Sequence, residues 1–146
     1  MEYKGSNYLR ELIRTLVRNL GILEKDDLGC FGVTISQCHA IVEIGRTKDI
    51  SLNELAKLLT LDKSTMSRTI DNLVKNGLVA RELHKEDRRY ITIRLTDNGM
   101  KIFKNIEGTM EKYYTNIFMS IPENKREQVL DSLRLLTEAV NQNKCC

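Results

Sequence analysis

Apolar residues recur at steps of three and four along most of this chain, and that spacing is typical of amphipathic helices. It predicts a first helix from about Glu2 to Lys25, ended by the charged, glycine-containing segment EKDDLGCFG. Two long helices are expected to close the chain, one starting at Thr96 and one with Pro122 in its first turn. Their predicted inward residues are Ile102, Ile106, Met110, Tyr113 and Ile117 in the former, and Val129, Leu133, Leu136 and Val140 in the latter.

The middle of the chain predicts three shorter helices. The first begins at a Thr34 or Ser36 cap and runs to about Arg46. The next opens with Ser51-Leu52-Asn53-Glu54, which fits a capping box. After a tight connection at Thr60-Leu61, an Asp62 cap starts the third helix. We expect that helix to bury Met66, Ile70, Leu73 and Val74 and to end at Asn76-Gly77.

A β-hairpin follows this helix pair. The segment 78–83 can form a strand, 84–88 is a polar loop, and 90–95 alternates as a returning strand. We therefore predict a mainly α fold with a small hairpin, in one continuous structural domain. Residues 1–33 and 101–146 would be dimerisation helices flanking a core of short helices and hairpin at 34–100, because apolar stripes on flanking helices often pack against a second copy.

The predicted helix after Asp62 has a polar and basic outer face. Once the inward positions are removed, Lys63, Ser64, Thr65, Ser67, Arg68, Thr69, Asp71, Asn72 and Lys75 remain. Small hydroxyl residues let the backbone approach a groove floor, an arginine can make a bidentate contact to guanine, and lysines suit phosphates. The simpler interpretation, a solvated helix face, is weakened by the neighbouring hairpin. Our candidate DNA-binding residues here are Lys63, Ser64, Thr65, Ser67, Arg68 and Asn72.

The loop of the hairpin carries the second basic group, Lys85, Asp87, Arg88 and Arg89. Asp87 can hold a neighbouring guanidinium so that it points outward, and a guanidinium so held suits the narrow minor groove of A·T-rich DNA. An ordinary charged turn is the alternative.

Composition narrows the function classes. The 146 residues are 41% hydrophobic and 29% charged, which is typical of a globular domain. No apolar run could span a membrane and no signal-peptide core is visible, so we expect a cytoplasmic protein with reduced thiols. No carboxylate pair or phosphate-binding motif accompanies the two histidines, which argues against an enzyme. A winged-helix protein-interaction module stays as an alternative, although such a module would more often expose apolar residues on the helix that follows Asp62.

The sequence resembles the MarR family (multiple-antibiotic-resistance regulators) of winged helix-turn-helix proteins. The segments LNELAKLLTLDKSTMSRTIDNLVKNGLV and DRRYITIRLTDNG carry the resemblance, and the flanking helices also fall where that family places them. The Asp-x-Arg pattern of the wing maps to Asp87 and Arg89, which makes Arg89 the expected minor-groove residue. The resemblance implies a homodimer on a pseudo-palindromic double-stranded operator, usually a repressor released by a small ligand or by thiol oxidation.

Two kinds of signal remain open. Cys30, Cys38, Cys145 and Cys146 could converge on a thiophilic ion or react with an oxidant, with His39 as a nitrogen ligand for zinc. Equally, Cys38 could be a small core residue and the last pair a frayed tail. The family's more common signal is a phenolic or aromatic effector. Its pocket would be lined by Leu16, Phe31, Ile41, Ile44, Met110 and Tyr113, each of which could instead be plain core.

Overall fold

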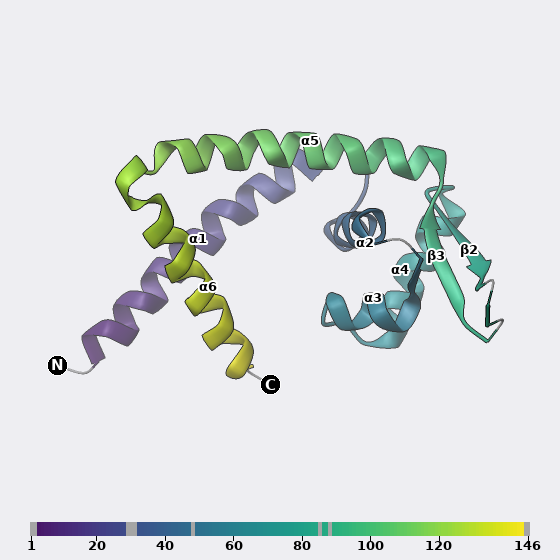
Figure 1. Cartoon of the computed structure of the whole chain (residues 1–146), viewed down its shortest axis with the longest axis horizontal. Helices are drawn as coiled ribbons and strands as arrows, with labels where there is room; N and C mark the ends of the chain where they lie inside the picture. The colour runs from purple at the N-terminus through teal and green to yellow at the C-terminus, as the bar shows by residue number, and fades with distance from the viewer. Residues whose placement is uncertain (1–2, 29–31, 48, 85, 88, 145–146) are drawn as a thin grey trace. The chain divides into compact units, whose positions relative to one another are not determined.

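The computed structural model describes residues 3–28, 32–47, 49–84, 86–87 and 89–144. It divides into two compact units, Met1–Glu107 and Gly108–Cys146. Along the chain the elements are α1 (Tyr3–Leu28), α2 (Ile35–Arg46), β1 (Ile50–Ser51), α3 (Leu52–Leu58), α4 (Lys63–Lys75), β2 (Val79–Leu83), β3 (Ile91–Leu95), α5 (Asp97–Ser120), the 3-10 helix η2 (Glu123–Lys125) and α6 (Arg126–Gln142) (Figure 1).

The helix caps follow the sequence signals closely. Thr34 caps α2 and forms a full capping box with Gln37, which the sequence analysis had not anticipated. Ser51 Oγ accepts a bond from the Glu54 amide at 3.1 Å, which is one half of the box predicted there. Just after the C-terminal end of α4, Gly77 has φ +74°, a conformation that glycine adopts without steric cost.

Two predicted helix boundaries are wrong. Helix α1 continues to Leu28, because Glu, Lys, Asp and Leu are all compatible with a helix and the next glycine is Gly29. Pro122 does not lie in the first turn of α6: it precedes η2, and α6 starts at Arg126. The Arg126 guanidinium instead donates to the carbonyls of Phe118, Ile121 and Met119 at 3.1–3.2 Å, so it satisfies the exposed end of α5.

The sheet has three antiparallel strands in the order β1-β3-β2. Ile50 pairs with Ile93 and Val79 with Leu95, so β3 is the central strand. Strand β1 could not be predicted from the sequence, since two residues carry no alternation. The core of the first unit lies between the sheet and α2, α3 and α4. Its largest fully buried side chains are Ile41, Ile50, Leu55, Met66, Ile70, Leu73, Ile93 and Ile106. Each contributes about 1.5–3 kcal/mol through burial.

Outside this core, many apolar side chains remain exposed. Leu12 on α1 is 51% exposed, Leu133 on α6 45% and Val140 56%, although the last two were predicted to face inward. Within the described part of the second unit, no side chain is buried. The predicted inward position at Ile106 is confirmed, whereas Ile117 is 37% exposed. None of the helices in the described ranges combines the length and apolarity that a membrane crossing requires.

Candidate nucleic-acid interface

Helix α4 presents its polar and basic residues to solvent. Lys63, Ser64, Arg68 and Asn72 are exposed, and Thr65 and Ser67 are half-buried. The predicted buried positions Met66, Ile70 and Leu73 lie on the opposite face, while Val74 is only half-buried. The arrangement leaves one side of the helix available to a partner.

Thr69 does not belong to that outer face. It was predicted among the outward residues, but only 8% of it is exposed. Its hydroxyl donates to the Thr65 carbonyl at 3.1 Å, and this local bond lets a polar side chain pack beside Met66 and Ile70. The outer polar face of α4 is therefore narrower than the sequence predicted.

The first turn of α4 is fixed by Asp62. Its carboxylate accepts bonds from the Thr65 amide at 2.7 Å and from the Thr65 hydroxyl at 2.9 Å. These bonds hold the pKa of Asp62 below its ordinary value, and the bond from the Thr65 amide has the largest effect. The cap is therefore ionised at neutral pH. Because the Thr65 hydroxyl proton is committed to the cap, this side chain can offer a nucleic acid only acceptor lone pairs.

The hairpin tip holds Arg89 in a fixed orientation. Asp87 Oδ1 accepts from Arg89 Nε at 3.0 Å and Asp87 Oδ2 from Arg89 Nη2 at 2.9 Å, and the Arg89 amide also donates to Oδ1 at 3.1 Å. The Arg89 side chain is nevertheless 85% exposed. The predicted contact between Asp87 and a neighbouring arginine is confirmed. Lys85 and Arg88, predicted for the same surface, lie outside the described residues.

This carboxylate–guanidinium contact persists at neutral pH. The side-chain bonds from Arg89, followed by its amide, hold the pKa of Asp87 below its ordinary value, and the same contact raises the pKa of Arg89. The contact is therefore complete above the ordinary carboxyl pKa of about 3.9 and is lost only as the pH falls through the lowered value. His84 completes the turn: its Nδ1 accepts from the amides of Glu86 and Asp87 at 3.2 and 3.3 Å.

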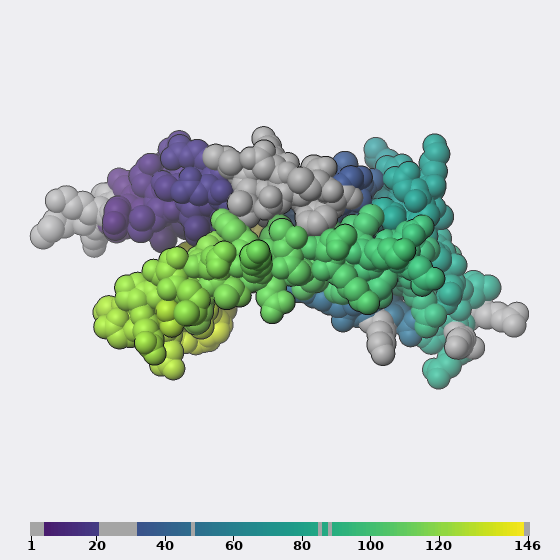
Figure 2. Space-filling view, turned by 90° about the horizontal axis from the view of Figure 1, so that it is seen from above, coloured from purple at the N-terminus to yellow at the C-terminus, as the bar shows by residue number. Residues whose placement is uncertain are grey.

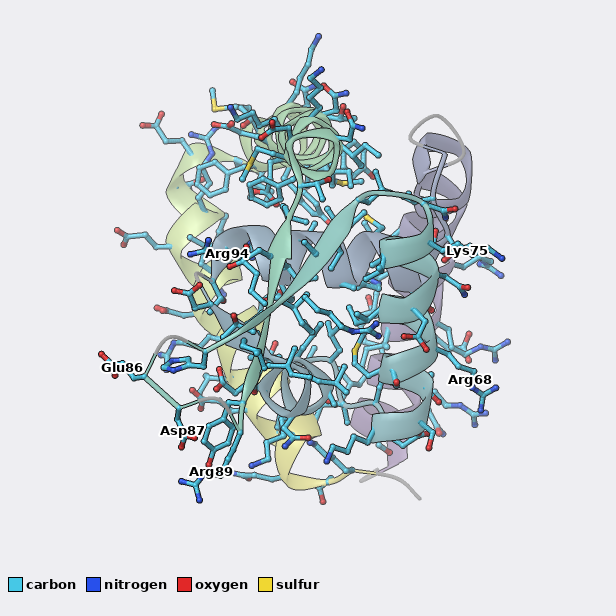
Figure 3. All side chains as sticks on the ribbon, turned by 90° about the vertical axis from the view of Figure 1, so that its right-hand side faces the viewer. Arg68, Lys75, Glu86, Asp87, Arg89 and Arg94 are labelled. Carbon is cyan, nitrogen blue, oxygen red and sulfur yellow. The ribbon has the colours of Figure 1, made fainter. Side chains whose placement is uncertain are left out.

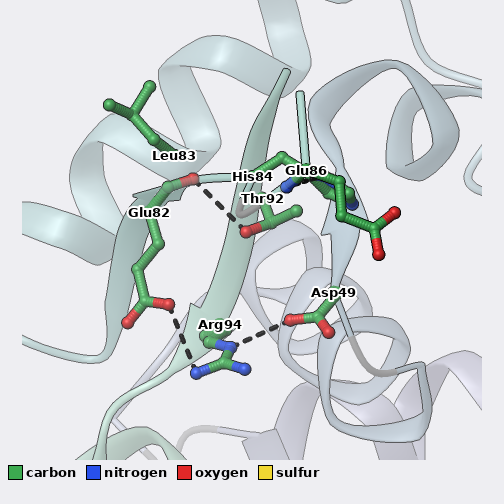
Figure 4. Close-up of a pocket in the computed structure, with 7 residues that line it drawn as sticks. All are labelled: Asp49, Glu82, Leu83, His84, Glu86, Thr92 and Arg94. Carbon is green, nitrogen blue, oxygen red and sulfur yellow. Dashed lines mark hydrogen bonds and ion pairs between the residues drawn. The ribbon is translucent and has the colours of Figure 1, made fainter. Parts of the chain in front are cut away.

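The base of the hairpin is held by ion pairs that the sequence analysis did not identify. Arg94, on the central strand, donates from Nε to Asp49 at 3.0 Å, and its Nη1 lies 3.2 Å from a Glu82 oxygen (Figure 4). These contacts raise the pKa of Arg94, and the hydrogen bond to Asp49 has the largest effect. The three groups line an open pocket of about 230 Å³ together with Leu83, His84, Glu86 and Thr92 (Figure 4).

A second ion pair joins the hairpin to the helix. Arg81 on β2 donates from Nη2 to Asp71 on α4. Strand alternation places Arg81 on the same face as its pairing partner Ile93, but no local pattern relates it to Asp71. A search for opposite charges on the outer helix face and the adjacent strand could have suggested the pair.

The exposed basic side chains of α4 and the arginine of the hairpin tip lie in two separate places in the first unit. Arg68 and Lys75 project from the side of α4 away from the hairpin, and Asp87 and Arg89 lie at the hairpin tip (Figure 3). In the space-filling view, side chains in the teal colour that α4 and the hairpin share protrude from this unit (Figure 2). A duplex would therefore be engaged at two points, as expected for a helix in one groove and an arginine in the next.

The predicted sensing residues are only partly described. Cys38 is 6% exposed and lies in the core of the first unit, as its alternative interpretation as a core residue expects. His39 beside it is exposed. Cys30, Cys145 and Cys146 lie outside the described residues, so the convergence of the thiols stays a prediction. Among the described residues, no group of three or more His, Cys, Asp or Glu side chains could hold a metal ion.

The predicted effector pocket is not assembled within either unit. Ile41 and Ile44 are buried in the first unit and Leu16 there is exposed. Met110 and Tyr113 belong to the second unit, and Phe31 lies outside the described residues. Of this set, Ile44 does line a pocket of about 350 Å³, together with Gly45, Thr47, Asp49, Ile93, Arg94, Leu95 and Met100.

Comparison with known proteins finds a family model, a sequence relative and solved structures that are similar to this chain. The model of the MarR family matches residues 33–91. The HTH-type transcriptional regulator BilQ of Clostridium symbiosum is 23% identical over 121 residues, which cover 83% of this chain and 84% of that protein. The FabT protein of Streptococcus pneumoniae, solved in complex with DNA, superposes with a TM-score of 0.87 at 21% identity over 95% of this chain and 99% of that one. MarR itself superposes with a TM-score of 0.72 at 26% identity, covering 93% and 92%.

The matched region contains the capped α3–α4 pair and most of the hairpin, including Asp87 and Arg89. The structural matches extend to the flanking helices as well, since they cover nearly the whole of both chains. Over residues 33–91 the chain is similar to the MarR family, and over nearly its whole length it has the winged helix-turn-helix fold of MarR.

Proposed function

We propose that this chain is a sequence-specific DNA-binding transcription regulator, with α4 in a major groove and Arg89 in the adjacent minor groove. The observation that carries the proposal is an exposed polar and basic helix face beside an arginine held rigidly at a hairpin tip. The FabT relative was solved with DNA bound, which supports the same use of this fold. The family consists of regulators and not enzymes. The polar outer face of α4 also disfavours the alternative of a protein-interaction module.

Arg89→Ala tests the wing assignment. We expect weaker binding at low salt to a duplex that the parent protein selects from a random library, because the arginine no longer enters the minor groove. The logarithmic salt dependence should flatten by about one phosphate equivalent or less. Fluorescence anisotropy over a salt series measures both quantities. Arg46→Ala, which removes an exposed arginine of α2, is the control.

Asp87→Asn separates orientation from charge. This variant keeps the Arg89 charge but loses the carboxylate that holds the guanidinium, so affinity should fall without a flatter salt dependence. If Arg89→Ala binds the selected duplex as tightly as the parent does, the wing has no role in DNA binding.

We also propose that the regulator acts as a homodimer on a pseudo-palindromic operator. The exposed apolar side chains of α1 and α6, and the lack of any buried side chain in the described part of the second unit, support pairing through these helices. The two copies would present two α4 helices about one turn of the duplex apart. Such a protein would work in the cytoplasm, where the operator lies.

Leu12→Lys tests the assembly. Leu12 is 51% exposed in the single chain, and its burial against a second copy would contribute about 1.5–3 kcal/mol in each subunit. Sedimentation velocity should show a dimer for the parent and a shift toward monomer for this variant. Glu11→Lys, on the adjacent exposed position of α1, should stay dimeric. A parent protein that sediments as a monomer at micromolar concentration contradicts the proposal.

Repression relieved by a small phenolic or aromatic effector is the mode of regulation that we propose. The pocket of about 350 Å³ beside Ile44 is in the size range of small-molecule sites and combines apolar walls with Arg94 and Asp49. Thiol chemistry remains the alternative. A variant without the four cysteines distinguishes the two, since only a thiol sensor would then stop responding to its oxidant or metal.

A further inference from the structure

The ion pair between Asp71 and Arg81 joins the two elements proposed to read DNA. Asp71 belongs to α4 and Arg81 to β2, and both side chains are partly exposed, at 57% and 39%. Among the ion pairs of the described residues, this one connects the helix directly to the hairpin, whereas Arg94 connects the hairpin to the segment before β1.

Asp71 occupies an unexpected position for a carboxylate. It lies three residues after Arg68 and four before Lys75, so it borders the exposed side of α4 that carries both, at the edge where the helix contacts β2. A carboxylate there would repel the phosphates of an approaching duplex. The guanidinium of Arg81 compensates its charge locally, and in doing so holds β2 against α4.

Folding stability does not explain the pair well, because ion pairs this exposed contribute little to stability. The spacing of the reading elements offers a better reason. Arg68 projects from one side of α4 and Arg89 lies at the hairpin tip (Figure 3). Both can contact one duplex only if the hairpin keeps a fixed position relative to the helix.

We propose that Asp71 and Arg81 are positioning residues for DNA binding, which hold the hairpin so that α4 and Arg89 reach the duplex together. The inference rests on the proposed DNA-binding function. Its distinguishing consequence is energetic coupling between Arg68 and Arg89 in DNA binding. In the parent, removing Arg68 should alter the effect of removing Arg89, and breaking the ion pair should abolish that dependence.

The experiment uses the full chain and two probes, a duplex that the parent selects from a random library and an unrelated duplex of equal length. Arg81→Gln should weaken binding to the selected duplex on the order of tenfold, the scale of interactions between neighbouring sites. Arg46→Gln is the matched control, because it removes one positive charge and breaks the exposed Arg46–Glu107 pair. Its effect should be small and equal on both probes.

The charge swap, Asp71→Arg with Arg81→Asp, decides between positioning and direct contact. It restores the ion pair in reverse, so it should recover most of the affinity and the coupling between Arg68 and Arg89. Thermal unfolding of each variant checks that binding is measured on folded protein.

Several results would overturn the proposal. If Arg81→Gln weakens both probes equally and only as much as the control does, Arg81 contributes charge alone. No recovery by the swap would mean that Arg81 contacts DNA itself. If Asp71→Asn strengthens binding to both probes equally, Asp71 acts only by repulsion. A parent protein that selects no duplex would instead refute the proposed function, which distinguishes the two failures.

Discussion

Truncation of Arg68 to alanine is expected to reduce binding to the selected operator by about 1–3 kcal/mol, roughly 5- to 150-fold, because a bidentate contact to a guanine edge would be lost. Arg68 lies on the exposed face of α4, one turn before Asn72, where a helix in the major groove brings side chains to the bases. Competition titrations against single-base variants of the operator would locate the base pair at which discrimination disappears.

Lys75→Ala provides the contrast. Lys75 lies in the last turn of the same helix and suits a phosphate, so its removal should weaken binding to all duplexes by a similar factor. If the loss caused by Arg68→Ala is equally uniform across unrelated sequences, Arg68 contacts the backbone and carries no sequence information.

Gly99→Ala is expected to be the most damaging substitution for the fold. Gly99 is buried in the first turn of α5, and an added methyl group would overlap the carbonyl oxygen of Leu78. That carbonyl also accepts the Thr96 amide at 3.1 Å, while the Thr96 hydroxyl donates to the Gly77 carbonyl at 2.6 Å. Because the added Cβ is fixed to its backbone and the other atom is a backbone oxygen, no side-chain rotation can relieve the clash. We expect destabilisation of about 1–3 kcal/mol or more.

Gly108→Ala in the same helix is the matched control for this effect. A methyl group added at Gly108 meets no atom within 4 Å, and the helix should gain about 0.5–1 kcal/mol from the lost flexibility of glycine. Urea unfolding monitored by circular dichroism compares the two variants. Equal stability of Gly99→Ala and the parent would show that α5 does not pack closely on the turn between α4 and β2.

Local signals in the sequence predicted the parts of the site that depend on local bonds. Asp62 as a cap, Gly77 as the helix end and Asp87 as the partner of Arg89 each involve residues within a few positions of one another. The physical rule in each case concerns one turn of backbone, so an isolated segment contains the information. The same holds for Thr34, one of two predicted caps for α2.

Features that depend on distant segments were missed. β1 is two residues long and exists through its pairing with β3, some forty positions away. The contacts Asp71–Arg81 and Arg94–Asp49 likewise arise only after the hairpin folds back onto the helices. Thr69 was predicted wrongly for another reason: its polarity suggested exposure to solvent, but a bond within its own helix satisfies the hydroxyl.

If a second copy covers the exposed apolar faces of α1 and α6, the amount of protein in the cell becomes part of the regulatory mechanism. If these faces are covered only by a second copy, assembly and folding are linked by mass action, and the melting temperature rises with total concentration. At low copy number the population would shift to isolated subunits, which present one reading helix each and are open to proteolysis. Promoter occupancy would then rise more than proportionally with the rate of synthesis, since occupancy depends on the association of two copies.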